Sequence, residues 1–416
     1  MEGFEIMLSL LRRPVWLAAS VALAATVGTP AMADPVAGPH VQAYGWGVDY
    51  DGQVGDGGTS DVLTPQPLTL PDDVRQIAAG GYFGAALTGD GQVWTWGANF
   101  EGYLGDGTTE PHAPRPVPGL TGIVQVSAGT RHVLALDGDG DVWSWGANER
   151  GQLGDGTRDE QDAPHQVPGL TDFVQVSAGD QTSLGLRADG TVWAWGANDW
   201  GELGDGTQDD SLTPERVTGL DDVVQVAVAF GGYHSVALRA DGTVWGWGAN
   251  DYGQLGTGSA DQWVITSPVQ AIGVQGATQV AAGEGDTLAV VNGQAWGWGG
   301  NYFGQLGDGT REERHVPAPI GPDNVVQVAT GYSNTAVVRA DGTVWAWGYN
   351  ANGTLGTGST DLFAQPAPVP GLTGVAHLSA GFGFMLALAT PSTVDTPDLA
   401  TGSIGGGGPP PPHPNV

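Results

Sequence analysis

In Asp141-Val-Trp-Ser-Trp-Gly-Ala-Asn-Glu-Arg-Gly-Gln-Leu-Gly-Asp-Gly-Thr157 the chain shows the unit that it repeats, with small changes, along almost its whole length. The second tryptophan of each copy is found at Trp46, Trp96, Trp145, Trp195, Trp247, Trp298 and Trp347. Successive copies are therefore 49 to 52 residues apart. A fixed period in this range is typical of solenoids and propellers, so the chain is a tandem array of seven units.

One unit reads as a series of short strands. Residues 124–129 and 132–136 are two predicted strands, and Asp-Gly pairs at 137–140 supply the positive φ values of a tight hairpin turn. Residues 141–146 form a third strand, and Leu153-Gly-Asp-Gly-Thr157 is a turn-rich excursion whose Asp side-chain oxygen is expected to stabilise the turn. The proline-flanked segment 164–168 suits an outer edge strand. Three or four antiparallel strands in about 50 residues are typical of one propeller blade. We therefore predict an all-β fold, a seven-bladed β-propeller.

The tryptophans of the unit explain how blades pack. Trp143 and Trp145 lie two positions apart on one strand, so both side chains point to the same face of the sheet. The small Ser144 between them leaves the other face flat, so that neighbouring blades can approach closely. A sugar-stacking role is the alternative, but the pattern is too regular for exposed platforms. We assign structural roles to Trp96, Trp145, Trp195, Trp247, Trp298 and Trp347.

The two ends of the array complete one another. Residues 42–47 form a tryptophan strand with no strands before it, whereas residues 377–388 form first and second strands with no tryptophan strand after them. We predict that both fragments share one blade, which closes the ring and removes its free edges. The propeller then spans residues 34–390.

Both termini differ in composition from the repeats. Arg12-Arg13, the apolar run 15–27 and Ala31-Met32-Ala33 have the form of a secretory signal peptide, so we predict a signal peptide at residues 1–33 and a secreted mature chain. The apolar run is shorter than the roughly 20 residues of a spanning helix, so we expect no stable membrane insertion. Residues 391–416 are rich in Gly and Pro, which predicts a flexible tail without a core.

Charge and residue types exclude several functions. The formal net charge is −32, with 13 Arg, no Lys and 45 acidic residues, which disfavours a nucleic-acid partner. There is no Cys, hence no disulfide and no thiolate metal site. The run Asp137-Gly-Asp-Gly-Asp141 faintly resembles the start of a calcium loop, but it lacks the later bidentate Glu. No catalytic His spacing is found, so we expect a non-enzyme without metal or cofactor.

The consensus Val-x-Val-Ser-Ala-Gly-x-x-His-x-x-Ala-Leu, followed by Asp-Gly-x-Val-x-x-Trp-Gly-x-Asn-x-x-Gly-Gln-Leu-Gly-Asp-Gly-Thr, resembles the repeat of the regulator of chromosome condensation family. The resemblance covers about residues 41–390. The family includes a nuclear exchange factor for the small GTPase Ran and secreted bacterial propellers, one of which inhibits β-lactamases. The predicted signal peptide, the acidic surface and the lack of a basic tail argue against nucleotide exchange. The predicted signal peptide favours the branch of secreted bacterial propellers.

Comparison of the units with one another suggests where a partner binds. The scaffold positions repeat, but the three residues after each Ser-Ala-Gly element vary, and in a propeller these loops gather on one face. Rigid aromatic side chains there are hot-spot candidates. The alternative is packing between blades, which we expect of Phe384, and for the two histidines a hydrogen bond to the next blade. We select as partner-binding residues Tyr82, Phe83, Arg131, His132, Tyr233, His234, Tyr332, Asn334 and Phe382.

The sequence thus predicts a secreted, monomeric scaffold that binds another protein of unknown identity through one face. The alternatives are a β-lactamase inhibitor and a polysaccharide-active enzyme, the latter requiring carboxylates that converge in the central channel. A scaffold of one fold serves unrelated partners, so the fold does not name the target.

Overall fold

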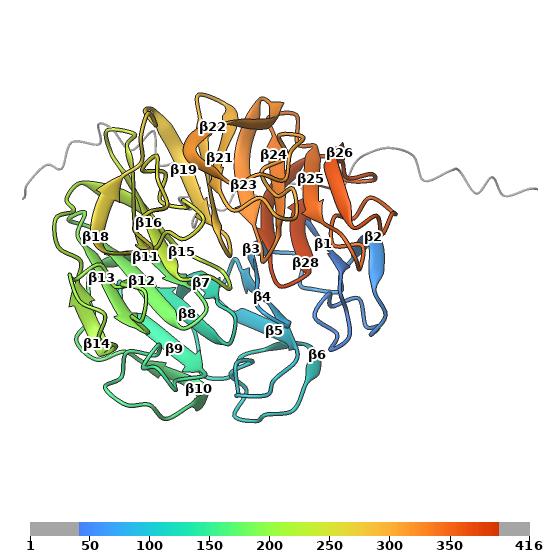
Figure 1. Ribbon diagram of the computed structural model, residues 1–416. Coiled ribbons are helices and arrows are strands. Elements are labelled where there is room, and N and C mark those ends of the chain that lie inside the picture. Colours follow the sequence, from blue (N-terminus) through green and yellow to red (C-terminus); the bar gives the residue numbers. More distant parts are fainter. Residues whose placement is uncertain (1–40, 391–416) are drawn as a thin grey trace, which may run out of the picture.

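The computed structural model describes residues 41–390, in which 28 strands form seven four-stranded antiparallel sheets. The sheets stand as blades around a central axis (Figure 1). This confirms the predicted all-β, seven-bladed propeller. Within the described part of the chain there is no helix with the length and hydropathy that crossing a membrane requires. The predicted signal peptide (1–33), the first residues of the predicted propeller (34–40) and the predicted tail (391–416) lie outside the described residues.

Each blade runs from an innermost first strand to an outermost fourth strand. Blade 1 holds β3 (Val74–Ala79), β4 (Phe83–Thr88), β5 (Val93–Gly97) and β6 (His112–Pro116). Blade 2 holds β7 (Ile123–Ala128), β8 (His132–Asp137), β9 (Val142–Gly146) and β10 (Gln161–Gln166). Blade 3 holds β11 (Phe173–Ala178), β12 (Thr182–Arg187), β13 (Val192–Gly196) and β14 (Ser211–Arg216).

The next three blades repeat this order. Blade 4 holds β15 (Val223–Val228), β16 (His234–Arg239), β17 (Val244–Ala249) and β18 (Val264–Gln270). Blade 5 holds β19 (Ala277–Ala282), β20 (Asp286–Val291), β21 (Gln294–Gly299) and β22 (Arg314–Asp323). Blade 6 holds β23 (Val325–Thr330), β24 (Asn334–Arg339), β25 (Val344–Tyr349) and β26 (Phe363–Pro368).

Blade 7 joins the two ends of the array, as predicted. It holds β27 (Val375–Ala380), β28 (Phe384–Ala389), β1 (Gln42–Gly47) and β2 (Val62–Pro67). The N-terminal β1 pairs antiparallel with the C-terminal β28, from Gln42 opposite Ala389 to Gly47 opposite Phe384. Blue and red segments therefore meet in one sheet (Figure 1). The ring is closed by hydrogen bonds between strands, not by a covalent link.

The second tryptophan of each unit lies buried between blades, at the position to which the sequence analysis assigned a structural role. These seven side chains are among the largest fully buried ones in the described chain. Trp145 of blade 2 lies in a cluster with Leu104 and Val117 of blade 1, and its indole N–H donates to the Tyr103 carbonyl at 3.0 Å. The glycine that follows each of these tryptophans has φ between 100° and 108°, a region that excludes side chains. Together these contacts hold each blade against the preceding one.

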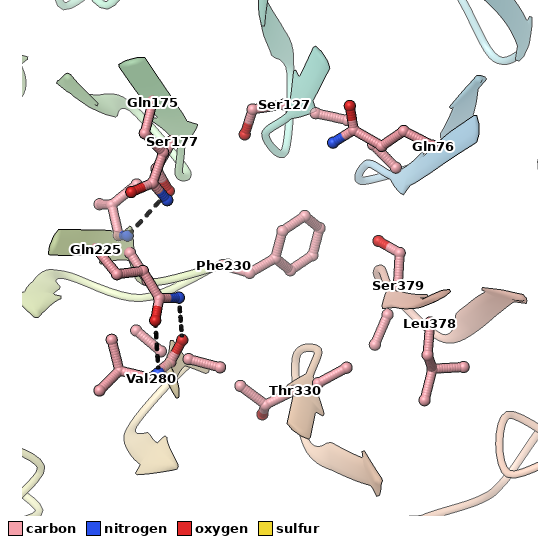
Figure 2. A pocket seen from close by; sticks show the side chains of 18 of the residues that line it. Gln76, Ser127, Gln175, Ser177, Gln225, Phe230, Val280, Thr330, Leu378 and Ser379 are labelled. Carbon is pink, nitrogen blue, oxygen red and sulfur yellow. Dashed lines mark hydrogen bonds between the residues drawn. The ribbon is translucent and has the colours of Figure 1, made fainter. Parts of the chain in front are cut away.

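A ring of glutamines also joins the first strands, and the sequence analysis missed it. In six blades a first-strand glutamine donates to one backbone carbonyl of the next blade at 2.7–3.0 Å and accepts the amide of the same residue at 2.9–3.1 Å. Figure 2 shows both bonds for Gln225 and Val280. The members are Gln76, Gln125, Gln175, Gln225, Gln279 and Gln327, with His377 at the seventh position.

Substitution of Gln225 by alanine is expected to lower the free energy of unfolding by about 2–4 kcal/mol. The change leaves the buried N–H and C=O of Val280 without partners, and each unpaired group costs about 1–3 kcal/mol. Urea-induced unfolding measures the loss. Gln66→Ala is the control, because Gln66 is exposed and its side chain donates to Thr64, two residues away on the same strand. Equal stability of both variants would contradict a role of the ring.

Candidate functional site

Two sets of loops open at the same edge of the propeller. The strands are antiparallel, with His132 at the start of β8 opposite Gly146 at the end of β9. The loops between first and second strands (such as 129–131) therefore emerge beside those between third and fourth strands (such as 147–160). We call this surface the loop face. The opposite face carries the hairpins between second and third strands and the connections from one blade to the next.

Five of the predicted partner-binding residues are accessible on the loop face. Tyr233 is 44% exposed. Arg131 and three aromatic side chains are half-buried: Tyr82, Tyr332 and Phe382. The structure thus brings these residues to one surface around the channel mouth.

Four other selected residues are wrong as partner contacts, because their side chains are buried: Phe83, His132, His234 and Asn334. Each opens a second strand and points between blades. His132 Nε2 lies 2.9 Å from Ser183 Oγ of the next blade, and the histidine of blade 4 makes the equivalent contact with Thr287. Burial lowers the pKa of both imidazoles to about 3. These histidines join neighbouring blades, which was the alternative reading, and Phe384 is buried as expected.

A second set of variable residues surrounds the triplets after the Ser-Ala-Gly elements, and the sequence analysis missed it. We call the triplets the inner ring of the loop face and this second set the outer ring. It consists of the pair that follows the Asn of each Trp-Gly-x-Asn element, or the Asp at that place in blade 7. Several aromatic members are strongly exposed: Tyr302 (70%), Phe100 (68%), Tyr50 (62%) and Tyr252 (48%). The comparison of units that singled out the inner loops could have found these positions too. The pairs are Tyr50-Asp51, Phe100-Glu101, Glu149-Arg150, Asp199-Trp200, Asp251-Tyr252, Tyr302-Phe303 and Ala351-Asn352.

A buried asparagine fixes the loop that carries each pair. In blade 2 the Asn148 side-chain carbonyl accepts the Leu153 amide at 3.0 Å, and its NH2 donates to Asp155 at 3.2 Å. Asp155 in turn accepts the amide and the hydroxyl of Thr157, both at 2.8 Å. The Gly-Asp-Gly-Thr excursion is thus held by turn chemistry, as the sequence indicated. Rigid loops present the variable side chains at fixed positions.

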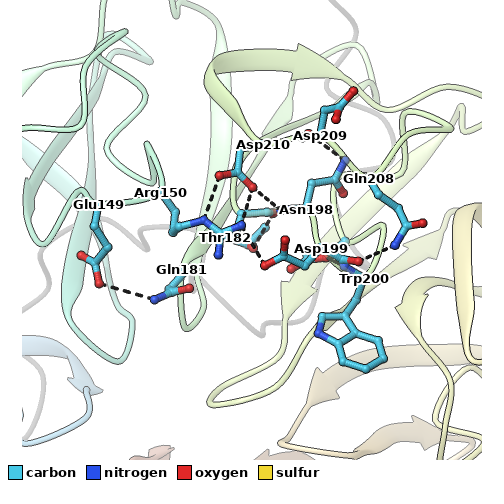
Figure 3. A network of polar contacts seen from close by, with 12 residues as sticks. Glu149, Arg150, Gln181, Thr182, Asn198, Asp199, Trp200, Gln208, Asp209 and Asp210 are labelled. Carbon is cyan, nitrogen blue, oxygen red and sulfur yellow. Dashed lines mark hydrogen bonds and ion pairs between the residues drawn. The ribbon is translucent and has the colours of Figure 1, made fainter.

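Carboxylates accompany the aromatic side chains, and they hold several arginines of the loop face. Arg150 of blade 2 bonds to Asp210 of blade 3 through Nε at 2.8 Å and Nη2 at 2.6 Å, and it lies 2.8 Å from Asp199 (Figure 3). Arg131 pairs with Glu101 at 2.8 Å and with Glu149. Arg158 of blade 2 also pairs with Asp210, at 3.1 Å, and Arg314 of blade 5 pairs with Asp308 at 2.6 Å. The acidic groups elsewhere on this face include Asp51, Asp180, Asp251 and Glu284.

Three aromatic side chains from consecutive blades touch at the channel mouth. The Tyr332 and Phe382 ring centres are 4.6 Å apart, and those of Phe382 and Tyr82 are 5.3 Å apart. The Tyr332 hydroxyl hydrogen-bonds to Glu284 of blade 5. Burial, followed by this bond, raises the pKa of Tyr332 to about 12. We call Tyr82, Tyr332 and Phe382 the mouth cluster.

The channel below holds a cavity of about 180 Å3 lined by the first strands (Figure 2). Its described lining contains Gln, Ser, Val and Ala side chains, Phe230, and His377 as the one titratable group. Burial lowers the pKa of His377 to about 4, so the ring is neutral. Converging carboxylates, which a polysaccharide-active enzyme would require, are absent from this described lining. Within residues 41–390 no group of three or more His, Cys, Asp or Glu is placed to hold a metal ion.

Comparison with known families and proteins agrees with the repeat. The model of the RCC1-like domain matches residues 40–322, and that of the regulator of chromosome condensation (RCC1) repeat matches 325–354 and 341–388. The ultraviolet-B receptor UVR8 of Arabidopsis thaliana is 33% identical over 308 residues, which cover 72% of this chain and 59% of the receptor. The chain therefore spans about three fifths of that relative's length. The human probable E3 ubiquitin-protein ligase HERC4 is 38% identical over 117 residues, 27% of this chain and 11% of the ligase.

Solved structures show the same architecture. Human WBSCR16 is 25% identical with a TM-score of 0.75, covering 85% of this chain and 99% of that one. Prp20p of Saccharomyces cerevisiae, reported with its binding properties to Gsp1p and histones, is 24% identical with a TM-score of 0.75. That alignment covers 85% of this chain and 93% of the yeast protein. The yeast protein shows a shared fold.

Proposed function

Because the chain belongs to the RCC1-like propeller family, whose fold commonly mediates protein–protein interaction, we propose that it binds a partner protein through the loop face. The single observation that carries the proposal is the composition of that face. Exposed or half-buried aromatic side chains stand on rigid loops at the inner and the outer ring, above a scaffold whose other positions repeat. Interfaces are enriched in such aromatic anchors.

The charge of the loop face selects the chemistry of the partner. Carboxylates on it outnumber its arginines, and Arg131, Arg150 and Arg314 are already paired with carboxylates. Complementary potentials steer association and disfavour partners of like charge. The proposed partner is therefore a protein with a basic segment that also offers apolar contact area.

Replacement of Tyr82, Tyr233 and Tyr332 together by alanine is expected to weaken partner binding by at least about 100-fold, because truncated hot-spot side chains cost about 1–4 kcal/mol each. The matched control changes three exposed valines at the opposite ends of first strands, Val174, Val224 and Val326, to alanine. Partners are captured with the mature chain from culture medium and cell-envelope extract. Calorimetry then measures the affinity of each captured partner for the original chain, the tyrosine variant and the valine variant.

Two results decide the proposal. Loss of binding in the tyrosine variant, with retention in the valine variant and weakening at higher salt, supports it. Unchanged affinity of every captured partner for the tyrosine variant, in a protein that melts at the original temperature, refutes it.

Export and the inhibitor alternative belong to the same proposal and need their own assays. We propose that residues 1–33 direct secretion, with the mature chain starting at Asp34. Fractionation and N-terminal sequencing test this. An inhibition assay across β-lactamase classes tests the second function, for which the loop face shows no specific feature. We propose no catalytic activity and no nucleotide exchange, since the yeast structure supports a shared fold alone.

A further inference from the structure

The geometry points to a guanidinium site at the channel mouth: we propose that the mouth cluster and Glu284 hold one arginine side chain of the partner's basic segment. This inference rests on the proposed function and names its anchor. It goes further because it assigns one subsite and one chemical group to a face that otherwise offers many contacts.

The aromatic side chains of the mouth cluster are tilted against one another and do not form a parallel stack. Tyr332 and Phe382 are inclined by 50°, and Phe382 and Tyr82 by 46°, so the three rings do not cover one another's faces. All three side chains remain half-buried instead of fully enclosed. A guanidinium within about 6 Å of a ring centre is attracted by the ring quadrupole and stacks on its plane.

Blade 4 contributes to the site through a two-residue insertion in its loop between the first and second strands. Gly129 and His132 bracket the loop in blade 2, whereas the equivalent Ala229 and His234 of blade 4 lie two residues further apart. The extra length lets Phe230 point into the channel centre (Figure 2). Gly231 has φ +70°, and a Cβ there would lie 3.0 Å from the Tyr332 ring. The insertion therefore lies directly against the mouth cluster.

Glu284 supplies the negative charge. Its carboxylate is held by the Tyr332 hydroxyl and by Ser333 Oγ at 3.2 Å, so it is fixed beside the rings. Partial burial raises the pKa of Glu284, and nearby Asp251 raises it further. A carboxylate that is partly desolvated without a cation gains when a guanidinium arrives with its N–H donors.

The arginines of the loop face are engaged with other groups. Arg131 and Arg150 of blade 2 are bound to carboxylates of blades 1, 2 and 3. Arg311 of blade 5 lies over the Tyr302 ring and donates to the Tyr302 carbonyl at 2.7 Å. The mouth cluster and Glu284 belong to blades 5, 6, 7 and 1. The aromatic side chains of the mouth cluster thus lie beside a carboxylate whose partners are two hydroxyl groups, those of Tyr332 and Ser333.

The probes are two peptides of equal size, acetyl-Gly-Arg-Gly-amide and acetyl-Gly-citrulline-Gly-amide, titrated into the isotope-labelled mature chain at low salt. Citrulline keeps the shape of arginine but carries no charge. We expect the arginine peptide to shift resonances of Tyr332, Phe382 and Glu284, and the citrulline peptide to bind at least about 10-fold more weakly. An acetyl-Gly-Lys-Gly-amide that binds as well as the arginine peptide would overturn the guanidinium assignment.

Variants locate the site. Glu284→Gln, which retains an oxygen for Tyr332 and Ser333, and Tyr332→Leu are each expected to weaken the arginine peptide about 5-fold or more. Tyr302→Leu is the control, since Tyr302 is 70% exposed on the outer ring of the same face. Equal binding of both peptides, or shifts confined to the outer ring, refutes the site. A captured partner that still depends on the loop face would then leave the proposed function standing, whereas a partner indifferent to that face removes the proposed function itself.

Discussion

Trp145→Ala is expected to lower the free energy of unfolding by about 3–5 kcal/mol, the usual range for removal of a large aromatic side chain from a core. The side chain is fully buried in the cluster shared by blades 1 and 2. Its loss opens a cavity between blades and leaves the Tyr103 carbonyl without its indole donor. The propeller ring is held closed by seven tryptophan contacts between neighbouring blades. Loss of one of them therefore also creates a weak interface at which the ring can open.

Urea unfolding and the melting temperature measure this effect. Trp263→Ala is the control, because Trp263 is 65% exposed and its loss is expected to change stability by less than about 0.5 kcal/mol. A loss below about 1 kcal/mol for Trp145→Ala would mean that the tryptophan is not the main contact between these blades. The role assigned to the repeated tryptophans would then be wrong.

Asp286→Asn is expected to stabilise the protein at neutral pH by more than 1 kcal/mol and to flatten the dependence of its stability on pH. Asp286 opens β20 at the position that holds His132 in blade 2 and Asn334 in blade 6. It is fully buried, and its Oδ1 has no hydrogen-bond partner. Burial, reinforced by nearby Glu284, raises the pKa of Asp286 to about 8, against a weak contact with Thr330 Oγ1 at 3.4 Å.

The sign follows from proton binding. Between the unfolded value of 3.8 and the folded value of about 8, the folded state binds more protons than the unfolded state. The contribution of Asp286 to stability is therefore full below pH 3.8 and is lost as the pH rises toward about 8, with a slope of up to ~1.4 kcal/mol per pH unit. Asparagine does not titrate, so the advantage of the variant grows over this window.

Denaturant unfolding at several values between pH 5 and pH 8 tests the effect. Asn334→Asp is the matched opposite change, which places an acid at the equivalent buried position and is expected to introduce the same pH dependence. Some dependence persists in Asp286→Asn, because burial also raises the pKa of Asp49 and of Glu202 to about 7. Parallel pH profiles for Asp286→Asn and the original protein would contradict the assignment.

The architecture was predictable because it depends on local patterns that recur. The Trp-x-Trp-Gly strand, the Asp-Gly hairpin and the proline-flanked outer strand each specify a short element from neighbouring residues. Their period of about 50 residues gave seven blades, and the half-units at residues 42–47 and 377–388 gave the shared blade. Gly-Asp-Gly-Thr as a turn also followed from its own residue types.

The binding residues were predictable only in part. The sequence of a triplet does not show which of its side chains is exposed and which is buried between blades. Phe83 and Tyr82 are neighbours, yet the first starts a strand and points between blades, stacked on Tyr103 at 4.8 Å, while the second faces the channel mouth. The pair after each asparagine was missed because the units were compared only at the triplets after the Ser-Ala-Gly elements. Its exposure depends on how the loop folds back over the buried asparagine.

Sequence repetition by itself determined the fold class, the number of blades and the closure of the ring, because each depends on contacts that every unit makes in the same way. Tertiary structure alone decided the glutamine ring, the burial of Asp286 and the mouth cluster. These arise where residues about 50 or more positions apart meet across blades, as Tyr332, Phe382 and Tyr82 do. Asp286 and the mouth-cluster residues are specific to single units, so no repeat pattern reveals their neighbours. The glutamines do recur, but their partners lie on the next blade, and only the folded ring shows this contact.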